Sequence, residues 1–151
     1  MSGRSDGIVI LMADDDEDDR LLAREALAQS LALAAELRFV NDGVELMQYL
    51  RREPPFADAA ATPRPGVILL DLNMPRMDGR EALQALKADP ELRRIPVVVM
   101  STSQADEDIV RSYDLGAASF ITKPVTFEGL VEVMRGFGTY WTEVVGLPAD
   151  E

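Results

Sequence analysis

VILLDLNMPRMDG, residues 67–79, joins a run of four apolar residues to an aspartate and then to a segment with proline and glycine. A short run of Val, Ile and Leu is typical of a strand that is buried on both faces of a parallel sheet. An aspartate that closes such a run often begins a turn. The stretch therefore predicts a buried strand with Asp71 at its carboxyl end.

Similar apolar runs recur along the chain and alternate with longer amphipathic segments, a pattern typical of parallel strands covered by helices on both faces. We expect strands at residues 8–13, 36–40, 67–71, 96–101 and 119–122. We expect helices at residues 18–29, 44–52, 80–88, 106–115 and 127 to about 145. Residues 53–66, EPPFADAAATPRPG, break both periodicities and predict a long surface loop.

The predicted fold class is α/β, a doubly wound, flavodoxin-like sheet of five parallel strands in the order 2-1-3-4-5. With 151 residues, of which 47% are hydrophobic, the chain is long enough for one compact core and too short for two ordinary domains. We expect the domain to span residues 8–145, with a flexible N-terminus at 1–7 and a C-terminal tail at 146–151.

The composition disfavours several classes of function. There are 15 basic and 27 acidic residues, and the formal charge of -12 argues against nucleic acid or an anionic membrane as partner. No apolar run reaches the ~20 residues that span a bilayer, and the start lacks the parts of a signal peptide, so we expect a cytoplasmic protein. The chain has neither cysteine nor histidine, which excludes disulfides, thiol nucleophiles, Ser-His triads and His-ligated zinc.

Acidic residues end the first and third predicted strands. Asp14 and Asp15 follow the first strand directly, and Asp71 closes the third. In a sheet of this order the two strands are neighbours, so the carboxylates share one crevice at the carboxyl edge. Crowded carboxylates repel one another unless a hard cation joins them, which predicts a site for Mg²⁺ or Mn²⁺. Taken alone, the run DDDEDD, residues 14–19, is more often a solvated helix cap than a ligand set.

Two further polar residues end predicted strands on the same edge. Ser101 ends the fourth strand, and Lys123 follows the fifth. A lysine ammonium can hold a phosphoryl oxygen as a point charge, and a carboxylate can attack phosphorus to form an acyl phosphate. By themselves such a serine and lysine would ordinarily be turn or surface residues. Together with the acids they predict an anion site beside a metal, with Asp71 as the nucleophile.

With these residues in place, the chain resembles the receiver domains of two-component response regulators, the CheY-like family, over residues 8–145. The phosphoacceptor of the family's D-x-x-M-P-x-M-D-G stretch falls on Asp71 in DLNMPRMDG. The family's paired acids, strand-four hydroxyl and K-P lysine fall on Asp14, Asp15, Ser101 and Lys123.

The resemblance implies roles for further residues. Asn73 supplies a backbone carbonyl to Mg²⁺, and Phe120 stands at the aromatic switch position, where many relatives carry tyrosine. The bond from Lys123 to Pro124 is cis in the family. Asn73 and Ser103, each two residues beyond a site residue, tune hydrolysis of the acyl phosphate.

A narrower resemblance is to the single-domain regulators that partner bacterial and cyanobacterial phytochromes. These share the long loop before the third strand and an ending like TYWTEVVGLP, residues 139–148. In that subfamily the fourth helix, fifth strand and fifth helix form a homodimer face. Here Phe137, Tyr140 and Trp141 belong to an apolar stripe at helical spacing, which fits that face or packing on the sheet.

The resemblance implies a response regulator that accepts a phosphoryl group on Asp71 from a sensor histidine kinase, a bacteriophytochrome in the narrower reading. The chain has no histidine to carry phosphate itself, so it receives the group from another molecule. The resemblance also implies that it signals by binding a downstream protein and that it is not an enzyme, apart from the chemistry of its own phosphorylation and dephosphorylation. A chemotaxis-type or relay receiver has the same site and another kinase.

Two readings from other classes remain open. A Mg-dependent aspartyl phosphohydrolase would carry an acid two residues after the nucleophile, where this chain has Asn73. A Ca²⁺-binding or unphosphorylated docking module predicts no covalent modification at all.

Overall fold

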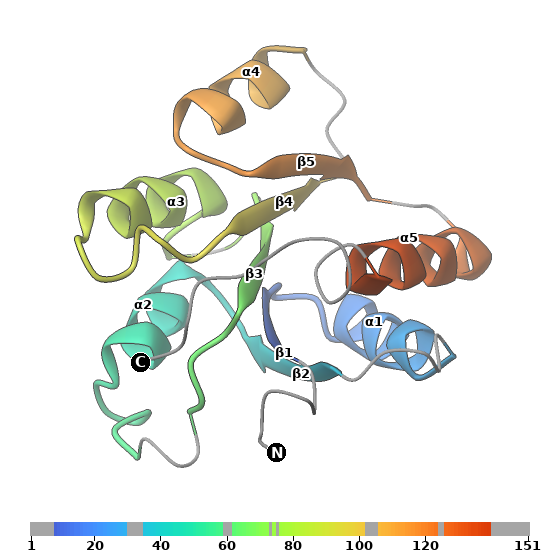
Figure 1. Ribbon diagram of the computed structural model, residues 1–151, viewed down its shortest axis with the longest axis horizontal. Coiled ribbons are helices and arrows are strands. Elements are labelled where there is room, and N and C mark those ends of the chain that lie inside the picture. Colours follow the sequence, from blue (N-terminus) through green and yellow to red (C-terminus); the bar gives the residue numbers. More distant parts are fainter. Residues whose placement is uncertain are drawn as a thin grey trace.

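In the computed structural model, strands and helices alternate along the chain (Figure 1). The structure describes residues 8–29, 35–58, 62–72, 74, 76–101, 106–123 and 126–139. The strands are β1 (Ile8–Ala13), β2 (Ala35–Val40), β3 (Val67–Asp71), β4 (Val97–Ser101) and β5 (Ser119–Thr122). The helices are α1 (Glu17–Gln29), α2 (Gly43–Arg51), α3 (Gly79–Ala88), α4 (Asp106–Asp114) and α5 (Phe127–Thr139).

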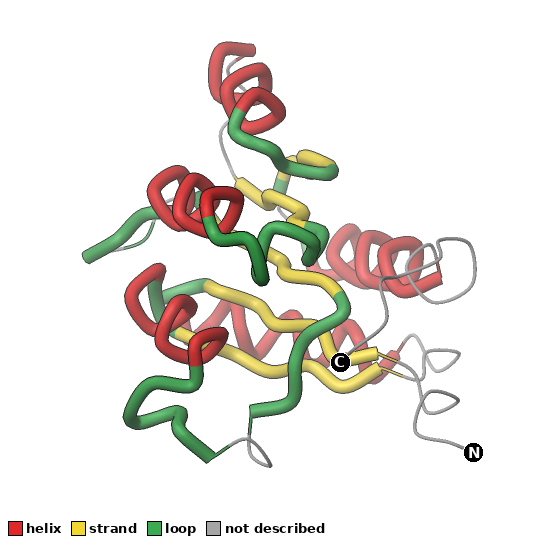
Figure 2. Tube along the Cα trace, turned by 60° about the vertical axis from the view of Figure 1, so that its left-hand side comes forward, coloured by secondary structure: helices red, strands yellow, loops and turns green. Residues whose placement is uncertain are grey.

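The strands form one parallel sheet in the order β2-β1-β3-β4-β5, which confirms the predicted fold class. Helices α1 and α5 pack together on one face, and α2 and α3 pack together on the other. Helix α4 lies beside β5, and Figure 2 shows the sheet between its covering helices from a second direction. A buried parallel sheet of this kind needs cover on both faces.

The core has two halves because successive side chains of a strand point to opposite faces of the sheet. In β3, Val67 and Leu69 pack toward the α1 and α5 face, whereas Ile68 and Leu70 pack toward the α2 and α3 face. All four are buried. Since full burial of such a side chain contributes roughly 1.5–3 kcal/mol, this packing holds the carboxyl end of β3 firmly in place.

The observed ends differ from the predicted ones by a residue at several points. β4 begins at Val97 because Pro96 has no amide hydrogen to give to the ladder, although its carbonyl accepts the Ile68 amide at 3.0 Å. α2 ends at Arg51 because Arg52 adopts a left-handed conformation with φ 53°. Four elements begin one residue earlier than predicted: β2, α1, α2 and α3. Helix α4 ends one residue earlier than predicted. Residues 140–145 of the predicted last helix lie outside the described residues.

Aspartate side chains begin the helices that surround the carboxyl edge. Asp16 accepts the amides of Asp18 and Asp19 at the start of α1, at 2.8 and 3.3 Å. Asp42 accepts the amide of Glu45 at the start of α2, and α3 begins with a capping box at its own aspartate. Such caps satisfy amides that a helix leaves free at its start. The acidic run after β1 is therefore a helix cap in part.

The connection between α2 and β3 was predicted to be a surface loop, and the structure corrects this in part. Phe56 is half-buried, and its ring lies 5.6 Å from that of Tyr49. The Tyr49 hydroxyl donates to the carbonyl of Pro63 at 2.8 Å, and Thr62 is buried. The ring contact and the hydrogen bond of Tyr49 thus hold the loop against α2.

In the part of the chain that the structure describes, no helix is long and apolar enough to span a bilayer.

Candidate functional site

The acidic residues predicted to meet do meet at the carboxyl edge. β1 and β3 are neighbours, with Ala13 opposite Leu70, so the residues that follow Ala13 lie beside Asp71. One carboxylate oxygen from each of Asp14, Asp15 and Asp71 lies within 4.8 Å of the others. Asp14 is fully buried and Asp15 is exposed, so the cluster reaches from the core to solvent.

The buried carboxylate of Asp14 has partners on both oxygens. Oδ1 accepts the Asp16 amide at 2.9 Å, and Oδ2 accepts Lys123 Nζ at 3.1 Å. Burial raises the pKa of Asp14 to about 6, against the opposing effects of the Asp16 amide and Lys123, and the charge of Asp71 raises the pKa further. The carboxylate is therefore one that a nearby positive charge would stabilise in its ionised form.

Lys123 joins this cluster from the end of β5. Its backbone amide donates to the Ser101 carbonyl at 2.7 Å, which carries the side chain over the edge of the sheet. Burial alone would lower the pKa of the ammonium, but the hydrogen bond from Lys123 to Asp19 and the charges of Asp14 and Asp71 raise it above its ordinary value. The ammonium lies 3.4 Å from Asp71 Oδ2, as the sequence-based hypothesis required.

The remaining predicted residues divide into those the structure describes and those it does not. Ser101 is fully buried at the end of β4, the neighbour of β3. Phe120 is half-buried and packs against the core on the α2 and α3 face. The other predicted site residues lie outside the part of the chain that the structure describes. They are Asn73, Ser103, Pro124, Tyr140, Trp141 and the side chain of Phe137.

Sequence reasoning missed Asp19, which it read only as helix-start charge. The carboxylate of Asp19 approaches Lys123 Nζ to 2.8 Å, nearer than Asp14 or Asp71. No local pattern singles it out from the other acids of the first turn of α1, because Asp19 and Lys123 are 104 residues apart.

A second missed contact joins the two loops beside the site. Arg76 donates to both carboxylate oxygens of Asp42, at 2.7 and 3.1 Å. Next to it, the Gly43 amide donates to the Met77 carbonyl at 3.0 Å. The segment between β3 and α3 is thereby fastened to the start of α2. No local pattern predicts this pair, since its members are 34 residues apart.

The donor set fits a divalent cation. Carboxylate oxygens are the hard ligands that Mg²⁺ and Mn²⁺ prefer, and Asp15 gives the cluster an exposed side for water ligands and substrate. Asp14, Asp15 and Asp71 bring more negative charge than the single ammonium of Lys123 balances. An additional positive charge would relieve this repulsion.

Residues 10–135 match the model of the response regulator receiver domain. The chain therefore belongs to the response regulator receiver domain family, as the sequence resemblance implied. Its fold, its acidic crevice and its place in two-component signalling are those of that family.

Among the relatives, response regulator Rcp1 of Synechocystis sp. is 39% identical over 141 residues, 93% of this chain and 93% of Rcp1. The crystal structure of the Mn²⁺-bound form of Rcp1 superposes on this chain with a TM-score of 0.83. The match covers 94% of this chain and 99% of the Rcp1 chain. The phosphorylated cyanobacterial phytochrome response regulator RcpA is 43% identical, with a TM-score of 0.86 over 95% of this chain and 99% of its own. This chain is thus related to phytochrome-associated regulators.

Proposed function

We propose that this chain accepts a phosphoryl group on Asp71 from a separate histidine kinase and signals by phosphorylation-dependent binding to another protein. One observation carries the proposal. Asp71 ends a buried strand with Asp14 and Asp15 oxygens within 4.8 Å and the Lys123 ammonium at 3.4 Å. The acids would hold a divalent cation, and that cation together with the Lys123 ammonium can bind, orient and neutralise a phosphoryl group at the Asp71 carboxylate.

In the proposed reaction a carboxylate oxygen of Asp71 attacks phosphorus, the bond from phosphorus to the donor breaks, and an acyl phosphate forms. Asp14, Asp15, Asp71 and the Asn73 carbonyl would hold a divalent cation, which when bound neutralises charge on the phosphoryl oxygens. Lys123, whose ammonium lies 3.4 Å from Asp71 Oδ2, adds a second positive charge. The chain has no histidine, so the donor belongs to another molecule, either a kinase or a small acyl phosphate.

The proposed output is a change at the surface of α4 and β5. Ser101 is buried at the end of β4, where its hydroxyl can move toward phosphoryl oxygens on the neighbouring strand. Phe120 pairs with Val99 across the β4–β5 ladder, and in the proposed output its half-buried ring turns inward. A ligand-driven shift between two such arrangements changes which partner the surface binds.

We propose a bacteriophytochrome as the kinase, since the likeness to RcpA, a phytochrome response regulator, supports a phytochrome partner for this chain. Phosphotransfer from purified phytochrome kinases in red and in far-red light tests this. We expect transfer that depends on light and on Asp71. Transfer only from kinases without a phytochrome module would favour the chemotaxis-type or relay alternative.

A homodimer through α4, β5 and α5 stays a prediction. Light scattering of the wild type and of Tyr140→Ala and Trp141→Ala variants, with and without acetyl phosphate, tests it. We expect dimers of the wild type that the two substitutions weaken. A monomer at high micromolar concentration in both phosphorylation states would contradict the prediction.

Intact-mass spectrometry after incubation with acetyl phosphate and Mg²⁺ tests the phosphorylation itself. We expect a gain of ~80 Da in the wild type that Asp71→Asn and EDTA both abolish, since Asp71 supplies the attacking oxygen. Asp18→Asn is the matched control, because Asp18 is an exposed acid of the same edge outside the carboxylate cluster.

The other outcomes identify the competing readings. Steady release of inorganic phosphate with many turnovers would indicate a phosphohydrolase. The absence of any mass gain in the wild type would favour a binding module that is not phosphorylated.

A further inference from the structure

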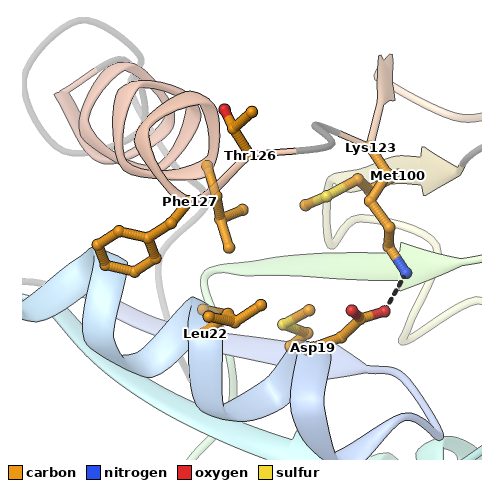
Figure 3. A pocket seen from close by; sticks show the side chains of 9 residues that line it. Asp19, Leu22, Met100, Lys123, Thr126 and Phe127 are labelled. Carbon is orange, nitrogen blue, oxygen red and sulfur yellow. Dashed lines mark hydrogen bonds and ion pairs between the residues drawn. The ribbon is translucent and has the colours of Figure 1, made fainter.

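Asp19 is a fourth acidic residue beside the site, and it holds the site's lysine from the side of α1. Figure 3 shows the contact as a dashed line from Asp19 to Lys123. The ammonium lies 2.8 Å from Asp19, 3.1 Å from Asp14 and 3.4 Å from Asp71. The shortest contact of Lys123 is therefore with a residue that has no part in the proposed metal or phosphoryl chemistry.

The backbone at Asp19 is fixed independently of its own side chain. Asp14 accepts the Asp16 amide, and Asp16 in turn accepts the amides of Asp18 and Asp19. The first turn of α1 is thus tied to the end of β1. A change in the Asp19 side chain leaves these caps intact, so its effect on Lys123 can be measured separately from helix formation.

The three carboxylates together use the full donor capacity of the lysine. An ammonium has three N–H donors, and Asp14, Asp19 and Asp71 each take one contact. For Lys123 to turn fully toward a phosphoryl group, one contact must weaken. Asp14 is fully buried, so leaving it without the ammonium is costly, whereas the Asp19 side chain is 31% exposed and water can replace its partner.

The surroundings of the lysine allow such a movement. A cavity of about 80 Å³ lies between α1 and α5 next to the Asp19–Lys123 pair. Its apolar wall includes Met12, and also Met100 and Phe127, which are labelled in Figure 3. The apolar stem of Lys123 can therefore shift into this space without displacing core side chains.

We propose that Asp19 is a positioning residue that draws the Lys123 ammonium away from Asp71 in the unphosphorylated chain, and so limits how strongly the site attracts a phosphoryl donor. This inference rests on the proposed function. Asp19 competes with the phosphoryl oxygens for the same ammonium. Removing its charge frees Lys123 for the incoming group.

The test measures the phosphorylation rate by intact mass against acetyl phosphate concentration, at constant Mg²⁺ and ionic strength. We expect Asp19→Asn to lower the half-saturating concentration about threefold, which is the effect of losing one partly exposed ion pair that competes for Lys123. Asp18→Asn removes an equal charge from the same helical turn without touching Lys123, and should match the wild type. Asp19→Glu keeps the charge and should restore the wild-type value.

A background with Lys123→Ala decides whether Asp19 acts through the lysine. We expect Asp19→Asn to have no further effect in that background. An equal effect with and without Lys123, or equal values for Asp19→Asn and Asp18→Asn, would overturn the inference. Asp19→Ser serves as a second variant if Asp19→Asn does not fold.

A spectroscopic readout separates failure of this inference from failure of the proposed function. The side-chain ammonium resonance of Lys123, identified by its loss in Lys123→Ala, should shift in Asp19→Asn but not in Asp18→Asn. No phosphorylation of the wild type would overturn the proposed function and the inference that rests on it. A phosphorylated wild type with an unchanged Lys123 resonance in Asp19→Asn would overturn the inference alone.

Discussion

Asp14 and Asp42 are both buried carboxylates, but their pKa values move in opposite directions. Burial dominates at Asp14 and raises its pKa to about 6. Burial would also raise the pKa of Asp42, but the hydrogen bonds from Arg76 and from the Glu45 amide lower it below its ordinary value. Asp42 therefore stays ionised and serves as a structural charge. The ionisation of Asp14, in contrast, responds to a charged ligand bound beside it.

The lowered pKa of Asp42 predicts how stability depends on pH. A carboxyl whose folded pKa lies below its unfolded value of 3.8 stabilises the fold above that value, and the contribution is lost as the pH falls from 3.8 through the lower folded pKa. We expect Asp42→Asn, which keeps a capping oxygen, to be less stable than the wild type at neutral pH and to approach it in acid. Chemical denaturation between neutral pH and pH 3 measures the difference.

Arg76→Gln completes this experiment from the other side of the ion pair. It leaves the Asp42 charge without its guanidinium and should move acid unfolding to higher pH. Arg93→Gln, at an exposed arginine, is the control. If the difference in the free energy of unfolding between Asp42→Asn and the wild type did not change with pH, the charge of Asp42 would not contribute to stability.

At the scale of elements, helix α3 rests directly on the backbone of the proposed phosphoacceptor. A Cβ atom at Gly79 would lie 2.4 Å from the Asp71 carbonyl oxygen and 2.7 Å from Leu72 Cα. The Gly79 amide donates to the Leu72 carbonyl at 2.9 Å. The start of α3 can approach β3 this closely only because a glycine stands there.

Gly79→Ala should therefore affect both stability and phosphorylation. We expect a loss of about 1–3 kcal/mol in the free energy of unfolding, because the backbone must move to admit the methyl group. The phosphorylation rate should fall at the same time, since the displaced backbone carries Asp71. Gln84→Ala, at an exposed position of α3, should change the unfolding free energy by no more than about 0.5 kcal/mol and leave the rate unchanged. Normal stability of Gly79→Ala would contradict the close approach.

At the scale of the whole molecule, the charge is strongly negative and part of it is concentrated at one edge of the sheet. The formal charge is -12, and Asp14, Asp15 and Asp71 gather where β1 and β3 end. The same core that buries β3 holds these acids together against their repulsion. A cation bound between them would therefore bind the folded chain in preference to the unfolded one.

Divalent cations are accordingly predicted to stabilise the fold. At one hundred times its dissociation constant, Mg²⁺ or Mn²⁺ should raise the free energy of unfolding by about 2.7 kcal/mol. Urea unfolding with Mg²⁺ or with EDTA, at matched ionic strength, measures this. Asp15→Asn should lose most of the gain, while Asp18→Asn should keep it. Equal gains in both variants would mean that the cation only screens the overall charge.

Local pattern and simple topology account for most of the fold and for the main residues of the candidate site. The apolar runs determined the strands, and strands β1, β3 and β5 have the predicted bounds. Asp14, Asp71 and Lys123 could be assigned to one edge because the carboxyl ends of parallel strands lie together. These features depend on side-chain order along each strand and on sheet order, and both can be inferred from sequence.

Contacts between distant side chains were decided only by the tertiary structure. Lys123 and Asp19 are 104 residues apart, and Arg76 and Asp42 are 34 apart. Which helix face meets which strand end depends on how α1 and α2 are rotated and packed on the sheet, and the apolar pattern leaves that rotation loosely defined. The order of residues along the chain is thus enough to predict that acids and a lysine share one edge of the sheet. Three-dimensional packing decided that Asp19 is the nearest partner of that lysine.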